Sequence, residues 1–411
     1  MAPVRYRHRL LVAFAASAMV ASSCASGSRR GGTGATSSNG AGPSAVTAAR
    51  VPSSQVPASP KEQVPSGLAF VLGGPDKGLP KPLVAVDKFL KGGPPPDGIP
   101  SIDAPRFLPT STVGFLADNE PVLALDIGGD ARAYPIQILV WHEIVNDTVN
   151  GEPVAVTYCP LCNSAVAYDR RVGTRVLEFG TSGLLWNSAL VMYDRQTQTL
   201  WSHFTGQGVV GVLTGVGLRA FPVSTVSWKT WRVAHPDGLV LSRDTGSQRD
   251  YGRNPYPGYD NVNSFPFLFE GKVDGRLTAM TRVVAVKSGE SAVAVPFEAL
   301  RKRRVIPVKS GRQSLVVWWE SGTTSALDSA QIADGTDVGA TGVFSSDVDG
   351  RTLAFRAASR GFVDTETGTV WDLLGHATDG PLAGHQLRAV EHVDTFWFAW
   401  STFQPNTTIV E

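Results

Sequence analysis

Apolar and polar side chains alternate along two segments of the chain, residues 122–135 and 283–296. Each segment contains a glycine near its middle and ends in a proline, Pro135 in the first and Pro296 in the second. Alternation with a period of two residues around a glycine turn is typical of a β-hairpin that buries one face. We therefore predict a hairpin in each segment. Short strand-like stretches between glycine turns elsewhere predict a mainly β protein with a few short helices, of the α+β class.

A longer match between two parts of the chain indicates an internal repeat. In both parts, tryptophan, glycine and leucine recur in the same order with nearly the same spacing. The matched residues are Trp201, Gly206, Gly211, Leu213, Gly215, Leu218, Arg219, Ala220, Trp228, Trp231 and Pro236, paired in order with Trp371, Gly375, Gly380, Leu382, Gly384, Leu387, Arg388, Ala389, Trp397, Trp400 and Pro405. We therefore predict two related β-rich halves from an internal duplication, residues 67–280 and 281–411.

Each matched block is also expected to contain a short helix. Trp228 and Trp231 are three residues apart, a spacing that places them on one helix face, and Pro236 would end the helix. Ser224 or Thr225 is the candidate N-cap.

The first residues have the pattern of an export signal. Three arginines between positions 5 and 9 precede an apolar run, residues 10–20, which is too short to span a bilayer, and small residues lead up to Cys24. A cysteine at this place resembles the lipobox of bacterial lipoproteins. We therefore expect residues 1–23 to be a signal peptide, Cys24 to be lipidated, and the protein to be anchored on the extracytoplasmic face of the cell membrane. The alternative is an ordinary secretory signal in which Cys24 is incidental.

The composition of the rest narrows the class of protein. Residues 24–66 are rich in Ser, Gly, Ala and Pro, which predicts a disordered tether. Three cysteines are too few for a disulfide scaffold. A net charge of +1 without a basic run argues against a nucleic-acid partner. The composition names no protein or small-molecule partner.

Residues capable of metal or redox chemistry are concentrated in the first half. An apolar stretch, residues 154–158, predicts a buried strand that leads into a Cys-x-x-Cys motif, Cys159 and Cys162. Alignment of the halves places Cys159 opposite Glu320, Cys162 opposite Thr323, His142 opposite Arg303 and His203 opposite Leu373. At these four matched positions the second half has no cysteine or histidine. We therefore take the four side chains of the first half as candidate site residues rather than scaffold.

Three hypotheses for this motif remain open. The leading one is that Cys159 and Cys162, joined by His142 and His203, bind Cu or Zn, since thiolate and imidazole suit both metals. The second is thiol–disulfide exchange, in which Cys159 attacks and Cys162 completes the disulfide. The third is a structural disulfide or a buried thiol pair in a non-catalytic module that binds the cell envelope.

Two further groups of polar residues are candidates. Glu143 follows His142 and could orient its ring or act as a general base. Residues 241–259 interleave Arg, Asp and Tyr with Gly and Pro, and the second half has no counterpart. The candidate site residues of this loop are Asp244, Asp250, Tyr251 and Arg253. The loop could form the wall of a pocket, or it could be a connector held by Arg–Asp pairs.

Five motifs have a family resemblance. They lie at residues 131–135, 141–147, 157–162, 190–194 and 244–259. Together they make the chain similar to the bacterial and archaeal family called domain of unknown function 3179, from about residue 99 onward. The resemblance implies no activity, because the family has none assigned, but its members often have export or lipoprotein signals. Asn163 stands where the family pattern leads us to expect glycine, so we expect less freedom for a positive φ there.

Overall fold

The computed structural model describes residues 46–47 and 79–411. The expected signal peptide, Cys24 and almost all of the expected tether lie outside the described residues. The exception within the tether is strand β1 (Val46–Thr47), which pairs antiparallel with β3 (Arg106–Pro109). In the part of the chain that is described, no helix has the length and apolar character needed to cross a bilayer.

The first half consists of short strands and two α-helices. Its remaining elements, in chain order, are η2 (Val86–Lys88), β2 (Leu90–Lys91), η3 (Thr110–Thr112), β4 (Pro121–Ile127), β5 (Asp130–Pro135), α2 (Ile136–His142), β6 (Ile144–Val149), β7 (Glu152–Cys159), β8 (Ser164–Asp169), β9 (Arg171–Val172), β10 (Arg175–Val176), β11 (Phe179–Trp186), β12 (Ala189–Asp194), β13 (Leu200–Ser202), β14 (Gly208–Val210), β15 (Ala220–Phe221), β16 (Ser224–Ser227), α3 (Trp228–Ala234) and β17 (Leu239–Leu241).

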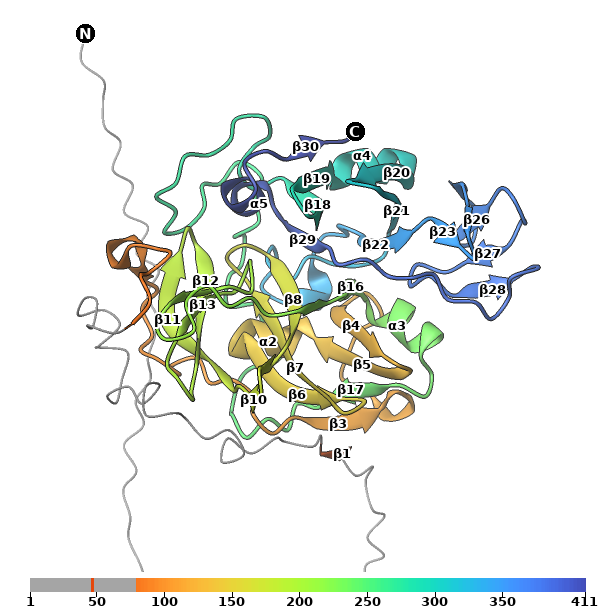
Figure 1. Cartoon of the computed structure of the whole chain (residues 1–411). Coiled ribbons are helices and arrows are strands. Elements are labelled where there is room, and N and C mark those ends of the chain that lie inside the picture. Colours follow the sequence, from red (N-terminus) through yellow and green to blue (C-terminus); the bar gives the residue numbers. More distant parts are fainter. Residues whose placement is uncertain (1–45, 48–78) are drawn as a thin grey trace, which may run out of the picture. The chain divides into compact units, whose positions relative to one another are not determined.

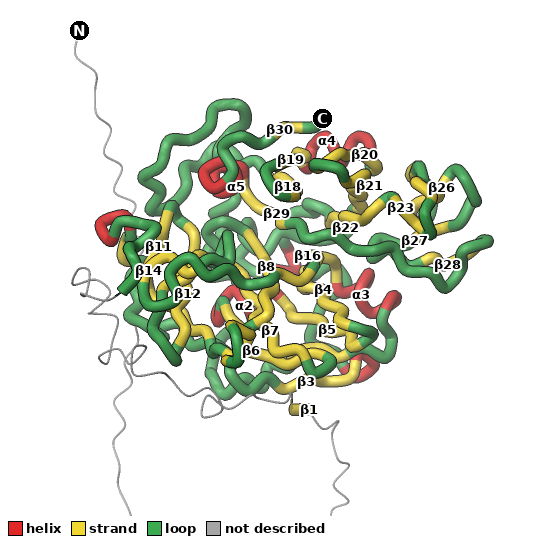
Figure 2. The backbone as a smooth tube through the Cα atoms, in the orientation of Figure 1, coloured by secondary structure: helices red, strands yellow, loops and turns green. Residues whose placement is uncertain are grey.

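The second half repeats much of this order. Its elements are β18 (Arg282–Ser288), β19 (Ser291–Pro296), α4 (Phe297–Arg303), β20 (Val305–Ser310), β21 (Gln313–Glu320), η4 (Ile332–Asp334), β22 (Ala340–Ser345), β23 (Asp347–Val348), β24 (Arg351–Thr352), β25 (Phe355–Ala357), β26 (Phe362–Asp364), β27 (Val370–Trp371), β28 (Ala377–Asp379), β29 (Val393–Phe396), α5 (Trp397–Phe403) and β30 (Thr408–Ile409). The expected class, mainly β with a few short helices, is confirmed, and Figure 2 shows the helices as short segments among strands and loops.

One sheet of each half has the same strand order. Strands β16, β4, β5 and β17 are neighbours in a six-stranded sheet that continues through β3 and β1, and β29, β18, β19 and β30 form the matching four-stranded sheet (Figure 1). In both, the last pair named is parallel and the first two pairs are antiparallel. The two predicted hairpins, β4–β5 and β18–β19, are confirmed.

The other sheets also correspond. The order β8-β7-β6 corresponds to β22-β21-β20, with β15 as an additional edge strand in the first half, and β14-β13-β12-β11 corresponds to β28-β27-β26-β25. In the second pair, Trp201 donates its indole N–H to Asp194 at 2.9 Å, as Trp371 does to Asp364 at 3.0 Å. These shared contacts agree with two related halves, and their origin by duplication stays a prediction.

The predicted helix at Trp228 forms, but its N-cap differs from the expectation. Helix α3 begins at Trp228, and the Ser227 hydroxyl accepts the backbone N–H of Thr230 at 3.1 Å. The expected caps, Ser224 and Thr225, are paired in strand β16 with β4. The sheet therefore extends up to the helix, and the serine at the strand end caps it.

Candidate functional site

The Cys-x-x-Cys motif joins two central strands of the first half. Cys159 ends β7 and pairs with Ser164, which begins β8, so residues 160–163 form a four-residue turn. Asn163 adopts a φ of 49° in this turn. The expectation that asparagine would restrict this turn was wrong, because asparagine tolerates the left-handed region better than most residues. In the second half Gly339, with a φ of 75°, precedes β22.

Both thiols are buried beneath the second half. Cys159 is 1% exposed and Cys162 is fully buried, and both are free thiols in this structure. The carbonyl oxygen of Cys162 accepts the backbone N–H of Phe396 at 3.1 Å and the hydroxyl of Thr395 at 2.7 Å. Strand β29 therefore covers the motif. Phe398, two residues after the end of β29, belongs to the same apolar cluster as the two cysteines.

The two thiols differ in acidity. Burial acts to raise the pKa of Cys159, but a hydrogen bond from Cys162 and backbone N–H groups, including those of Leu190 and Leu161, hold the pKa below its ordinary value. Burial raises the pKa of Cys162 well above the ordinary value, and the neighbouring Cys159 sulfur raises it further. Of the two thiols, Cys159 is therefore the one that loses its proton more readily.

A hydrogen-bonded chain leads from Cys162 to a buried histidine. The Cys162 sulfur lies 3.0 Å from the Ser164 hydroxyl oxygen, which is 2.8 Å from Nε2 of His203. Nδ1 of His203 is 2.9 Å from the Thr157 hydroxyl oxygen, and that hydroxyl donates to the carbonyl of Val166 at 3.2 Å. Because the carbonyl can only accept, Nδ1–H donates to Thr157 and Nε2 accepts from Ser164. Burial lowers the pKa of His203 to about 3, so the ring is neutral.

Glu143 is the other titratable neighbour of the thiols. It caps the C-terminus of α2 at a φ of 58°, and its carbonyl accepts the N–H of Tyr158 at 2.8 Å. Burial raises the pKa of Glu143 to about 8, with a further contribution from the charge of Cys159. Glu143 therefore belongs beside Cys159, whereas the sequence suggested a role beside His142.

The second half has a different pair at the same two positions. Arg304 caps α4 at a φ of 61°, and its carbonyl accepts the N–H of Trp319 at 2.9 Å. Burial raises the pKa of Glu320 at the end of β21, and the charge of Arg304 opposes this rise. The fold thus places the cap residue and the strand-end residue close together in both halves. Only the first half uses these positions for a carboxyl and a thiol.

His142 belongs to a separate cluster. Its Nδ1–H donates to the carbonyl of Pro100 at 2.7 Å, and its Nε2 accepts from the Tyr251 hydroxyl at 2.7 Å. Burial lowers the pKa of His142, which agrees with a neutral ring. Among residues 79–411, no group of three or more His, Cys, Asp or Glu side chains is placed to hold a metal ion. The expected set of Cys159, Cys162, His142 and His203 is therefore not assembled around one point, and Cu or Zn binding stays a prediction that this arrangement does not favour.

The charged residues of the loop that follows β17 lie at the surface. Asp244 pairs with Arg106, and Asp250 lies 3.8 Å from Arg253, with all four side chains at least half exposed. Of the four candidates in this loop, Tyr251 is the one that contacts a described candidate outside the loop, His142.

Tyr256 and Tyr259 of the same loop were not among the candidates, although both lie close to the two thiols. Tyr259 donates to the carbonyl of Leu161 at 2.8 Å. Burial raises the pKa of Tyr256, and the charges of Glu143 and Cys159 raise it further. Both tyrosines were visible in the motif, but nothing in the sequence distinguished a tyrosine that faces the core from one that faces solvent.

A comparison with protein families finds a match that includes all the residues of this site. The family model described as a protein of unknown function (DUF3179) matches residues 96–407. The chain belongs to this family. The DUF3179 match includes both halves, so the cysteine motif, Glu143 and the covering strand β29 all lie within it. No curated protein and no solved structure matches the chain.

Proposed function

We propose that this DUF3179 protein is a thiol–disulfide oxidoreductase in which Cys159 and Cys162 form the redox pair. One observation carries the proposal: two free thiols lie side by side at one four-residue turn, with the Cys162 sulfur 3.0 Å from the Ser164 hydroxyl oxygen. The pKa values of the pair are shifted in opposite directions, down for Cys159 and up for Cys162, which agrees with this arrangement. Thiolate is the attacking species in exchange, so the split assigns Cys159 as the nucleophile and Cys162 as the resolving thiol.

The exchange has two steps. Because Cys159 is only 1% exposed beneath β29, that strand must first move away from the motif. The Cys159 thiolate then attacks a substrate disulfide R–S–S–R′, forming the mixed disulfide Cys159–S–S–R and releasing R′S⁻. R′S⁻ takes the proton of Cys162, whose thiolate then attacks the Cys159 sulfur and releases RS⁻. The substrate disulfide gains two electrons, and the protein dithiol loses them as it becomes a disulfide. In the dithiol state the Cys162 thiol donates to the Ser164 hydroxyl oxygen at 3.0 Å, because that hydroxyl itself donates to His203.

Glu143 contributes by remaining neutral. With a pKa of about 8 it keeps its proton at pH 7, so it adds no negative charge beside the Cys159 thiolate. A carboxylate at this place would raise the pKa of Cys159 and weaken the split between the two thiols.

A redox titration tests the proposal. The purified protein is equilibrated in glutathione buffers of graded potential, quenched with acid, alkylated and measured by mass spectrometry. We expect one two-electron transition between the native dithiol and disulfide, within the range of about −120 to −300 mV typical of exchange proteins. A disulfide that is reduced only after denaturation, thiols that never pair, or near-stoichiometric Cu or Zn that is lost in Cys159→Ser would each overturn the proposal.

Replacing Glu143 with glutamine should change how stability depends on pH. Between about pH 4.5 and pH 8 the folded protein keeps Glu143 protonated, whereas the unfolded chain ionises it. Wild-type stability is therefore lost as the pH rises through this range, by up to about 1.4 kcal/mol per pH unit from this group. We expect the difference in unfolding free energy between Glu143→Gln and wild type to grow in favour of the variant over this range, measured by urea unfolding. Glu298→Gln, at an exposed carboxyl, is the control, and parallel curves for Glu143→Gln and wild type would contradict the assignment.

An extracytoplasmic, lipid-anchored location is part of the proposal, supported by the charged, apolar and small-residue order of residues 1–24. In a bacterial host, the wild-type protein is expected in the membrane fraction with the added mass of a lipid. The Cys24→Ser protein should move to the soluble fraction, followed by immunoblotting. Equal membrane association of the two proteins would rule out anchoring through Cys24.

A further inference from the structure

A second candidate site lies where the two halves meet. A cavity of about 590 Å³ opens between the turn after β4, the end of α3 and the loops around β27 and β28. That volume is within the range of about 300–1,000 Å³ of small-molecule sites. It shares no lining residue with the thiol site described above.

Two histidines, one from each half, meet in this cavity. The rings of His235 and His376 have their centroids 5.1 Å apart and stand nearly perpendicular, at 76°. Nδ1 of His376 lies 2.9 Å from a carboxylate oxygen of Asp372, which fixes that nitrogen as the donor and leaves Nε2 for another partner.

The same cavity has one cation without a partner and an apolar wall. Arg388 is exposed at the lining, and within residues 79–411 no acidic side chain forms an ion pair with its guanidinium. The apolar part of the lining that remains partly exposed is Pro222 and Leu374, while Trp231 is buried beneath the His235 ring, with ring centroids 4.3 Å apart. Asp126 is the acidic residue of the lining.

We propose that this cavity binds a small organic anion, with its carboxylate or phosphate group held by His235, His376 and Arg388 and its apolar body packed against Pro222 and Leu374. Arginine and protonated histidine are the usual partners of such groups, and an apolar wall suits a ring or short hydrocarbon. The site is independent of the cysteine chemistry and requires both halves.

Binding should strengthen as the pH falls. Burial and the neighbouring His376 lower the pKa of His235, whereas Asp372 raises the pKa of His376 against the effect of burial. Asp126 raises the pKa of both rings, and Arg388 is the remaining charged group of the lining. A bound anion favours the protonated rings, so affinity is expected to rise between pH 8 and pH 5.5.

Isothermal titration calorimetry of the full chain tests the site. The probes are phenyl phosphate, benzoate and inorganic phosphate, with benzyl alcohol as the uncharged control. We expect saturable binding of one of the two aromatic anions, weaker binding of inorganic phosphate and none of benzyl alcohol. His376→Gln and Arg388→Gln should each weaken binding at least about tenfold, the loss expected for one charged hydrogen bond.

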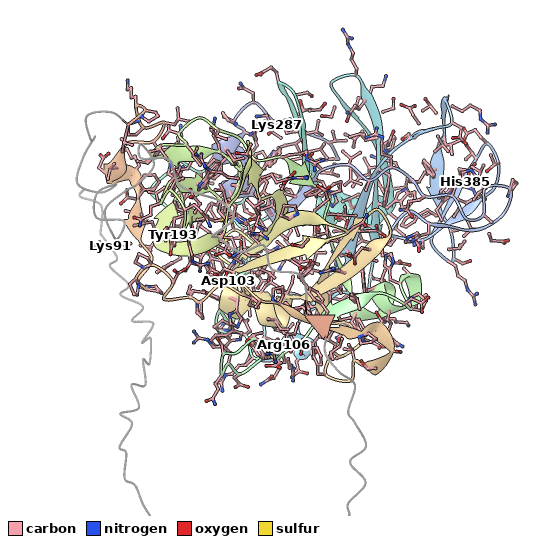
Figure 3. All side chains as sticks on the ribbon, turned by 60° about the horizontal axis from the view of Figure 1, so that its bottom comes forward. Lys91, Asp103, Arg106, Tyr193, Lys287 and His385 are labelled. Carbon is pink, nitrogen blue, oxygen red and sulfur yellow. The ribbon has the colours of Figure 1, made fainter. Side chains whose placement is uncertain are left out.

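Matched variants separate this site from its surroundings. His385→Gln changes a histidine of the same C-terminal region, labelled in Figure 3, that does not line the cavity, and it should bind like wild type. The Cys159→Ser, Cys162→Ser protein should also bind like wild type, so failure of the redox proposal leaves this one standing. Three results would overturn the proposal: no saturable anion binding at pH 5.5, unchanged binding in Arg388→Gln, or inorganic phosphate bound as tightly as the better of the two aromatic anions. Arg388 is exposed, so its replacement does not endanger folding.

Discussion

The Cys159→Ser protein should reduce disulfides at least about 10³-fold more slowly than wild type, because removal of a covalent nucleophile leaves only the background reaction. Cys159 is the thiol whose pKa lies below its ordinary value, and burial by itself raises the pKa of Cys162, the other described cysteine. The measurement is the rate at which the pre-reduced protein reduces a peptide disulfide, followed by mass spectrometry at pH 7.

The matched variant Cys162→Ser should behave differently. Without the resolving thiol, the mixed disulfide between Cys159 and the substrate cannot be released and should accumulate as a stable adduct of defined mass. Equal rates in the two serine variants, or an adduct on Cys162 in Cys159→Ser but none on Cys159 in Cys162→Ser, would contradict the assigned roles.

The Asp147→Ala protein should lose about 2–4 kcal/mol of stability, because Arg132 loses one of its two carboxylate partners and the buried Tyr134 hydroxyl loses its acceptor. The other partner of Arg132, Asp130, stays in place at 2.8 Å. Arg132 donates from one nitrogen to both carboxylate oxygens of Asp147, at 2.9 and 3.0 Å, and Tyr134 donates to the same group at 2.6 Å. Asp147 is 1% exposed and Arg132 is 8% exposed, so water cannot readily replace the lost partner. Urea unfolding followed by tryptophan fluorescence measures the loss.

A surface ion pair of the same protein provides the comparison. Asp244 pairs with Arg106, and both side chains are more than half exposed. Asp244→Ala should therefore change stability by no more than about 1 kcal/mol. Unfolding of Asp147→Ala and Asp244→Ala at the same urea concentration would contradict the prediction that the buried Asp147–Arg132 pair contributes more stability than the exposed Asp244–Arg106 pair.

The hairpins and the position of the cysteine motif could be predicted because their signals are local. Alternation in residues 122–135 directly reflects the pleat of β4 and β5, since successive side chains of a strand point to opposite faces. The apolar stretch before Cys159 likewise predicted a strand that delivers the motif to a turn, as β7 does.

The composition of the site could not be predicted, because it depends on distances between residues far apart in the sequence. His142 and His203 had equal support as ligands, yet His203 reaches the thiols through Ser164 whereas His142 bonds to Tyr251. The order of residues along the chain does not indicate which of the two histidines the fold brings close to the thiols.

The alignment of the halves also failed at one point, for a reason that the sheet register shows. Cys162 was placed opposite Thr323, but β21 and β22 are joined by residues 321–339, a much longer loop than the turn of residues 160–163. Glu320 pairs with Ala340 as Cys159 pairs with Ser164, so Cys162 corresponds to a residue close to β22 and not to Thr323. An insertion between matched strands shifts every residue pairing within the loop.

The hydrogen bond from Thr395 to the Cys162 carbonyl joins residues 233 positions apart. A ribosome makes the cysteines long before it makes the strand that covers them. During synthesis and folding, the two thiols are therefore open to oxidants and metal ions, and they become shielded only when β29 docks. We therefore expect the oxidation state of Cys159 and Cys162 to depend on the order of these events as well as on the redox potential of the surrounding compartment.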